Sequence, residues 1–475
     1  MDSDSAKHHE QPFKRSKLSA EEDNPQEAEV DRISNLPDTI RCHILSFLPT
    51  KFAVGTSILS THWKNLFALI PDLKLEFDDT LLLHPSKKRR VWGEKGDGNG
   101  FPGFVAGVMN RLMETASSIR EFNLKCYGRY EDDDCFLSAV DAAVRLRVQT
   151  VCLNVSMNSS SSNRSLICSL NGCTTLVKLV LTSCLYSSTL VDLPVVLKFP
   201  NLKSLILEQV TISDDMELLL DGCPVLQQLE MFNCDFEIFE DTFRISVHSL
   251  KVLTLKFCNM FGELLIVVDT PELETLFYGG LLYERYSFVS NFTRICALEL
   301  YVLWFDGEDS AAELSLPQFL TACSRVECLI FGQSTMETIY RLSLPLPKLC
   351  NLKMLRTRVA GMGSWNTLRR LIEGSPNLEM LTIDKGSSMI DGDYTCFLSP
   401  FEGVPYCLSS SITCIEIKSF EAQEEELKFI EYLLENGKVL KKMVFDNEFD
   451  WKQNDDVFKR ILEAELKSKT CKIFG

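Results

Sequence analysis

A leucine pattern recurs through the chain at a nearly constant interval, and no other feature restricts the possible folds as strongly. The unit is L-x-x-L-x-L followed by a polar or cysteine-containing turn. Its central leucine advances from 205 to 229, 253, 276 and 298, in steps of 24, 24, 23 and 22 residues. A period of this length is typical of arrays in which every unit adds one short strand to a shared sheet. Clear copies are Leu202-Leu205-Leu207, Leu226-Leu229-Met231, Leu250-Leu253-Leu255, Leu273-Leu276-Tyr278, Leu352-Leu355 and Leu378-Leu381-Ile383.

The repeat predicts an α/β solenoid, with a parallel sheet on the inside and helices on the outside. The leucines point into a core that no single repeat could bury alone. Between two strands, the segment from Ser213 to Pro224 has a capping serine or aspartate and helical apolar spacing, which predicts an outer helix. Weaker units at Phe122/Leu124, Val151/Leu153 and Leu179/Leu181 extend the array toward the N-terminus. The period and the pattern are those of leucine-rich repeats.

Residues between the leucines project from the inner face of such a sheet, which is the usual binding face of solenoids. Aromatic residues dominate protein interfaces, and paired arginines suit an acidic or phosphorylated partner. The alternative is that loops or long neighbouring side chains cover these positions. The predicted partner-binding residues are Phe232, Phe277, Tyr301, Arg356 and Arg358.

A different pattern occupies the stretch from Asp31 to Pro71, where apolar residues follow helical spacing. Pro37 suits the start of a first helix, Pro49 ends it, and a second short helix would carry Phe52 to Val54. Ser60 is a candidate N-cap for a third helix, which Pro71 would stop. About 40 residues cannot bury this much apolar surface alone, so the helices dock on the rest of the chain or on another protein.

This stretch resembles the F-box of plant proteins in Leu36-Pro37, HILSFLPTK (43–51), Ser57 to Ser60, and Trp63. Departures at Phe52, His62 and Phe67 remove no apolar anchor. The resemblance implies binding of a Skp-type adaptor and, through it, a cullin ubiquitin ligase; the alternative is a helical cap on the next domain. By the same resemblance, the adaptor-binding residues are Leu36, Pro37, Ile44, Leu45, Leu48, Val54, Leu59 and Trp63.

The end of the chain resembles the FBD module of plant F-box/leucine-rich-repeat proteins. The resemblance covers Val404 to Ser410, a strand at 411–420, a helix that begins at Glu424 to Glu426, and a strand from Val439 to Phe445. The Cys223-Pro224 element matches the repeats of the same proteins. The resemblance implies no activity for the module, and we expect it to continue and cap the solenoid, with a final helix at 455–469.

Five segments follow from these patterns. They are a disordered tail (1–29), the F-box (30–75), a linker with a glycine-rich loop and a helix (76–118), the leucine-rich repeats (119–400), and the FBD module with a C-terminal helix (401–475).

Composition excludes several functions. The net charge of −17 argues against a nucleic-acid-binding role, which needs a basic face. No apolar run approaches the ~18 residues of a membrane span, and the N-terminus has no secretory apolar region. The 18 cysteines are scattered without a C-x-x-C motif, which favours reduced thiols in the nucleus or cytoplasm rather than secretion. Cys184, Cys234 and Cys258 are expected to be buried turn residues rather than metal ligands.

No catalytic motif is present, and no cofactor is expected. The sequence therefore predicts a non-catalytic substrate-recognition subunit of a Skp–cullin–F-box ubiquitin ligase, which binds an unidentified target through its repeats. Two alternatives remain: a ligase-independent leucine-rich-repeat scaffold, and an F-box receptor that senses a small ligand.

Overall fold

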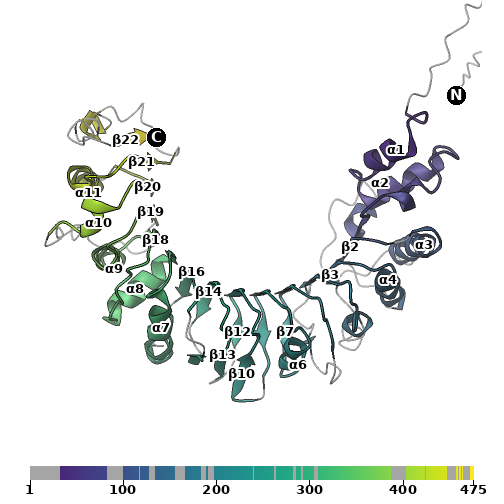
Figure 1. Ribbon diagram of the computed structural model, residues 1–475, viewed down its shortest axis with the longest axis horizontal. Coiled ribbons are helices and arrows are strands. Elements are labelled where there is room, and N and C mark those ends of the chain that lie inside the picture. Colours follow the sequence, from purple (N-terminus) through teal and green to yellow (C-terminus); the bar gives the residue numbers. More distant parts are fainter. Residues whose placement is uncertain are drawn as a thin grey trace, which may run out of the picture.

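The chain folds into an open arc, with strands along its inner side and helices along most of its outer side (Figure 1). The computed structural model describes residues 33–474 with gaps at 83–99, 117, 128–133, 156–165, 183–188, 191–196, 239, 261–263, 282–284, 290–292, 304–308, 387–402, 423, 447–455, 458, 462 and 464–470. The tail at 1–29 and the glycine-rich loop lie outside the described residues. Within them, no helix is both long enough and apolar enough to span a membrane.

The inner side of the arc is a single parallel sheet of 15 strands, joined in chain order. Its strands are β1 (Lys74–Asp78), β2 (Glu121–Cys126), β3 (Thr150–Val155), β4 (Lys178–Thr182), β6 (Ser204–Glu208), β8 (Gln228–Phe232), β11 (Val252–Lys256), β14 (Thr275–Leu281), β16 (Ala297–Leu303), β17 (Cys328–Phe331), β18 (Met354–Val359), β19 (Met380–Lys385), β20 (Cys414–Lys418), β21 (Lys442–Phe445) and β22 (Lys472–Phe474). Strand β1 spans the boundary between the stretches expected to be the F-box (30–75) and the linker (76–118), so the sheet begins earlier than the leucine pattern indicates.

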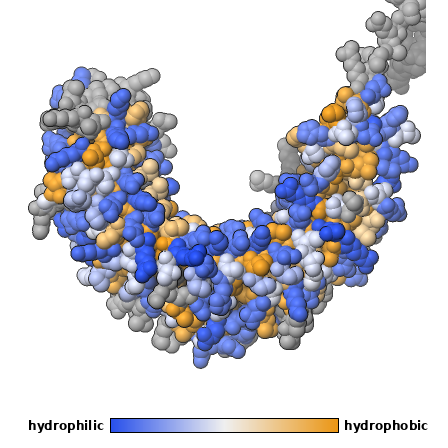
Figure 2. Space-filling model, in the orientation of Figure 1, coloured by the Kyte–Doolittle hydropathy of each residue, from blue (hydrophilic) through white to orange (hydrophobic). Residues whose placement is uncertain are grey.

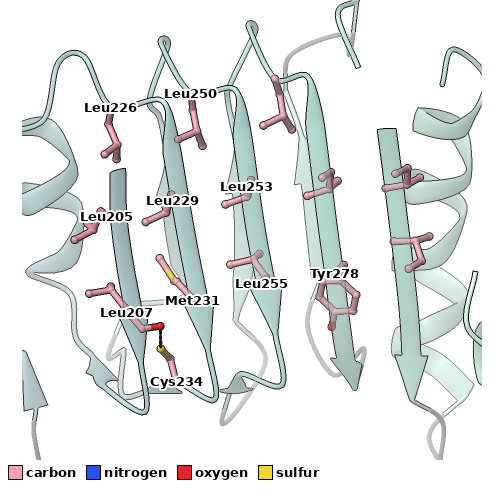
Figure 3. Close-up of a cluster of buried hydrophobic side chains, with 14 of the residues drawn as sticks. Leu205, Leu207, Leu226, Leu229, Met231, Cys234, Leu250, Leu253, Leu255 and Tyr278 are labelled. Carbon is pink, nitrogen blue, oxygen red and sulfur yellow. Dashed lines mark hydrogen bonds between the residues drawn. The ribbon is translucent and has the colours of Figure 1, made fainter. Parts of the chain in front are cut away.

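The leucines of successive repeats stand beside one another in register. Leu205 pairs with Leu229, which pairs with Leu253 and so on through Leu276 and Leu298. All of these side chains are buried, and Figure 3 shows Leu205, Leu229 and Leu253 side by side in the resulting ladder. The repeat prediction and the parallel solenoid are therefore confirmed.

Cysteines close the turn after two of these strands. The Cys234 thiol lies 3.5 Å from the carbonyl oxygen of Leu207 (Figure 3), and the Cys258 thiol lies 3.6 Å from that of Met231. Cys234 is buried and Cys258 is partly buried, so both are packing residues, whereas Cys184 lies outside the described residues.

The outer side of the arc is not helical throughout, which corrects a simple reading of the repeat. Helices cover the two ends, but between residues 209 and 296 the described connections contain one short helix, α6, and short strands in two small parallel sheets. These connections carry apolar residues such as Ile212, Phe236 and Ile245, which extended backbone buries as well as a helix would. The outer elements are α3 (Gly100–Thr115), α4 (Asp134–Arg145), β5 (Thr189–Leu190), β7 (Thr211–Ile212), α6 (Met216–Asp221), β9 (Asp235–Phe236), β10 (Thr242–Ile245), β12 (Asn259–Met260), β13 (Leu265–Val268), β15 (Arg285–Phe288), α7 (Asp309–Cys323), α8 (Gln333–Arg341) and α9 (Met362–Glu373).

The N-terminal module consists of α1 (Asp38–Leu45), α2 (Thr50–Gly55) and the 3-10 turns η1 (Thr56–Ile58) and η2 (Leu66–Leu69). The first two helices begin after Pro37 and Pro49, as expected. The prediction of a third α-helix from Ser60 is wrong. Asn65 has a left-handed backbone with φ of 77°, which interrupts the helical path, and a 3-10 turn buries Leu66 and Ala68 instead.

The C-terminal module continues the sheet. After α10 (Tyr406–Ser410) come strand β20, helix α11 (Glu424–Asn436) and strand β21, in the predicted order. Helical residues at 456–457, 459–461 and 463 lie within the predicted final helix, and strand β22, which the sequence did not predict, ends the sheet.

Candidate interaction surfaces

Apolar side chains stand exposed on the N-terminal module. Figure 2 shows apolar residues gathered over this end of the arc. Phe47 is 74% exposed and Ile58 is 87% exposed, values that are unusual for side chains of this size. Ile40, Phe47, Phe52, Ile58 and Leu69 were not among the predicted adaptor-binding residues, although Ile40 and Ile44 mark one face of α1 and Phe47 follows two residues after the end of this helix. The exposed apolar residues here are Ile33, Ile40, Ile44, Phe47, Leu48, Phe52, Ile58, Leu59 and Leu69.

The eight predicted adaptor-binding residues divide into three groups by burial. Leu36 and Val54 are half-buried. Leu45 and Trp63 are buried, with 1% and 6% of their surface exposed. These two pack inside the chain, so the structure does not support their placement at an adaptor surface. The four exposed residues are Pro37, Ile44, Leu48 and Leu59.

Trp63 stabilises the N-terminal module from inside by contacts with Ser34 and Arg41. Its indole Nε1 donates a hydrogen bond to Ser34 Oγ at 2.9 Å, and the Arg41 guanidinium lies 5.6 Å from its ring centroid. Arg41 in turn donates to the carbonyl oxygen of His62 and to the Asp38 carboxylate. The buried side of the module therefore holds α1 against η2, while the apolar residues of the other side face solvent.

An apolar cavity of about 210 Å³ lies where this module meets α3. Val54, Phe67, Phe104, Val108 and Leu112 form most of its wall. The polar groups around it come from Ser57, Asn65 and Arg111. A cavity of this size and lining has room for a small apolar molecule no larger than about a benzene ring.

A second surface lies on the concave face, around the amine of Lys256. Lys256 Nζ is 3.0 Å from Glu299 Oε1, 5.2 Å from the ring centroid of Phe277 and 5.9 Å from that of Tyr301. The lysine therefore covers parts of both rings, as the alternative interpretation of these aromatics anticipated. Lys256 of β11, Phe277 of β14 and Glu299 of β16 thus form one cluster across three strands, and neither Lys256 nor Glu299 was among the predicted binding residues.

Tyr301 lies over a glycine. A Cβ atom at Gly332 would be 2.5 Å from Cδ1 of the Tyr301 ring, so only glycine leaves room for the ring in this position. Burial and the neighbouring Glu299 carboxylate raise the pKa of Tyr301, and Arg356 and Arg358 act in the opposite direction. Tyr301 still exposes 36% of its surface and so offers a ring face fixed in place.

Arg356 and Arg358 stand exposed on the same face of β18, on either side of the buried Thr357. Among the residues described, neither guanidinium has a hydrogen bond or an ion pair. Phe232, by contrast, lies at the other end of the group, three strands from Tyr301, or about 14 Å along the sheet. The structure therefore brings Phe277 and Tyr301 together beside Lys256 and places the two arginines two strands beyond Tyr301, whereas Phe232 pairs with Lys256 at the opposite edge of the group.

The described part of the chain contains no group of three or more His, Cys, Asp or Glu side chains that could hold a metal ion. The thiols of Cys223 and Cys407 are buried, and burial raises their pKa to about 12 and about 11, which disfavours the reactive thiolate.

An arc of leucine-rich repeats with a small helical module that exposes apolar residues defines a repeat protein with two surfaces suited to protein recognition. Comparison with known protein families matches three segments of the chain to described domains. Residues 33–73 match the F-box domain, residues 141–305 match the repeats of "FBD-associated F-box protein At5g56370, LRR repeats", and residues 399–445 match the FBD domain.

Relatives from Arabidopsis thaliana align over nearly the whole chain. F-box/FBD/LRR-repeat protein At2g26030 is 28% identical over 473 residues, which cover 93% of this chain and 98% of that protein. FBD-associated F-box protein At5g27750 is 29% identical over 496 residues, with 93% and 98% covered. F-box/LRR-repeat protein 13 is 29% identical over 468 residues, with 94% and 96% covered. The chain belongs to the plant F-box/FBD/LRR-repeat family.

Proposed function

We propose that this protein is the substrate-recognition subunit of a Skp–cullin–F-box ubiquitin ligase. The F-box binds the Skp-type adaptor, and the concave face of the repeats binds a target protein. The observation that carries the proposal is the group of exposed apolar side chains on a module whose sequence matches the F-box domain. A patch of this kind on a small module is the mark of a protein interface.

The mechanism that follows is one of proximity. The chain supplies no catalytic group; it holds the target near the ubiquitin-transfer enzyme that the cullin recruits, and so raises the local concentration of target lysines. The arc connects the two binding surfaces rigidly, because every strand of the sheet is hydrogen-bonded to the next.

The proposal predicts that the intact chain captures a recombinant Skp-type adaptor and that loss of exposed anchors weakens the capture. In a Phe47→Ala/Ile58→Ala variant, binding should weaken by about 2 kcal/mol or more, since apolar anchors at the centre of an interface contribute most of its energy. Both residues are exposed in the free chain, so the substitutions leave its folding intact. Isothermal titration calorimetry measures the change.

A matched control removes exposed apolar groups elsewhere. Met362 is 52% exposed and Val404 is 49% exposed, and both lie outside the F-box. A Met362→Ala/Val404→Ala variant should bind the adaptor like the unaltered chain. Failure of the intact chain to bind any Skp-type adaptor would reject the ligase role. Adaptor binding without any effect on the abundance of captured proteins would favour the scaffold.

A further inference from the structure

We infer that the concave surface formed by Phe277, Tyr301, Arg356 and Arg358 binds an extended, acidic segment of the target, in which an anionic side chain lies about three residues from an apolar one. This inference rests on the proposed function and names the chemistry of the target at that surface. It follows from the charge, the partners and the spacing of four side chains.

The positive charge on this surface is only partly compensated locally. Lys256 is neutralised by Glu299 at 3.0 Å, but Arg356 and Arg358 have no such partner among the described residues. The nearest carboxylate in the sheet register is that of Asp384, which is paired with Arg358 across the two strands. Asp384 accepts a hydrogen bond from Ser419 Oγ at 3.4 Å and forms no ion pair with the arginine.

Two free guanidiniums on one strand favour an anion. Arg356 and Arg358 are two residues apart, so their Cα atoms are about 7 Å apart on the same face. Each guanidinium presents a planar set of N–H donors that matches the oxygens of a carboxylate or a phosphate. The chain carries a net charge of −17, but exposed charges are screened beyond about 8 Å at physiological salt, so nearby groups decide the local preference, and the two arginines outnumber the cross-strand carboxylate of Asp384.

The apolar half of the surface lies two strands away. Tyr301 is on β16 and the arginines are on β18, with the half-buried Ile330 of β17 between them. Two strand spacings amount to about 10 Å, and an extended chain rises about 3.3 Å per residue. A segment that crosses the strands therefore reaches from the arginines to the Tyr301 ring in about three residues.

Degenerate fluorescent peptide pools test the inference, with the full chain bound to its adaptor and fluorescence anisotropy as the measurement. Three pools carry phosphoserine, glutamate or serine at the centre and an aromatic residue three positions away; a fourth carries phosphoserine without the aromatic residue. We expect about tenfold tighter binding of the phosphoserine pool than of the serine pool, with glutamate between them. The glutamate pool separates a carboxylate from a phosphate as the source of the anion.

An Arg356→Gln/Arg358→Gln variant should bind every pool with the affinity that the unaltered chain has for the serine pool. An Arg120→Gln/Arg325→Gln variant removes the same charge from two other exposed arginines and should keep the preference. A Tyr301→Ala variant should lose the advantage of the pools with the aromatic residue.

Equal binding of the phosphoserine, glutamate and serine pools by the unaltered chain would overturn the inference, as would a preference that survives in the Arg356→Gln/Arg358→Gln variant or the absence of binding to any pool. Adaptor binding is measured on the same samples. Failure of the peptides with intact adaptor binding therefore rejects this inference alone, whereas loss of adaptor binding concerns the proposed function.

Discussion

The Leu229 side chain lies fully buried between Leu205 and Leu253 of the neighbouring strands (Figure 3). Its position recurs in every repeat, so the contacts it makes are repeated along the ladder. Leu218 has the same side chain but lies on the outer helix α6 with 38% of its surface exposed. These two leucines separate the effect of burial from the effect of side-chain type.

At the residue scale we therefore expect Leu229→Ala to reduce the free energy of unfolding by about 3 kcal/mol, because it leaves a cavity that the packed ladder cannot refill. Leu218→Ala should reduce it by less than about 1 kcal/mol. Urea-induced unfolding followed by circular dichroism gives both values. Similar losses in the two variants would contradict the ladder as the principal source of stability.

At the scale of elements, the ion pairs of Lys385 join the last repeat to the FBD module. Lys385 Nζ, at the end of β19, lies 2.5 Å from Glu421 Oε2 and 2.7 Å from Glu426 Oε1 on α11. Burial opposes the charge on this lysine, but its hydrogen bonds to Glu421 and Glu426 outweigh burial and raise the pKa of Lys385 above its ordinary value. The charged lysine therefore stabilises the contact between the two elements.

A Lys385→Met variant should lose about 2 kcal/mol at neutral pH. This is less than the loss expected for a fully buried pair, because Glu421 is exposed to solvent. Because the folded-state pKa is raised, the stabilisation is complete below the ordinary lysine pKa of about 10.4 and disappears as pH rises through the folded-state value.

Thermal unfolding of the unaltered protein and of the Lys385→Met variant at several pH values measures the difference in their stability. Lys353→Met, which breaks an exposed pair with Glu327, is the control and should change the stability far less than Lys385→Met does. A difference between the chain and Lys385→Met that grew at alkaline pH would contradict the assignment.

The sequence predicted elements well where a periodic pattern coincided with burial. The leucine ladder follows directly from spacing, and the strand–helix–strand order of the C-terminal module agrees with the one that the FBD resemblance implied. It failed at residues 60–71, where the spacing of Trp63, Leu66 and Ile70 is helical but the left-handed backbone at Asn65 ends the helix. The sequence also failed to predict the short outer strands, because strands of two to four residues are too short to show a clear period.

The candidate sites were predicted less completely, for a related reason. Spacing places Tyr301 and the arginines on one face, but it does not show that Lys256 covers the rings or that Gly332 makes room for Tyr301. Likewise, the F-box resemblance selects Leu45 and Trp63 without revealing that both are buried in this chain. Contacts between residues far apart in sequence decide these features.

At the scale of the whole molecule, each strand of the sheet is hydrogen-bonded only to the strands before and after it. The last repeat therefore needs a further element to pair with the free edge of its strand. The FBD module covers β19 through β20 and also packs Phe429 against Trp365, with ring centroids 5.4 Å apart. Without the module, β19 would be an open edge beside exposed apolar side chains.

Removal of residues 387–475 should therefore produce a chain that self-associates, which size-exclusion chromatography with light scattering would detect. A Thr382→Lys substitution in the shortened chain places a charge on the open strand and should reduce the association. A shortened chain that stays monomeric without the substitution would show that the module does not cover an edge.

The unbroken order of strands in the sheet also fixes the distance between the F-box and the concave binding surface. Eight strand spacings separate β1, beside the F-box, from β16, which carries Tyr301, and at about 4.8 Å each they amount to about 38 Å along the arc. Adding one repeat between them would move a bound target outward by one spacing and turn it with the curve. The number of repeats thus sets which lysines of a target come within reach of the transferring enzyme, independently of how tightly that target is held.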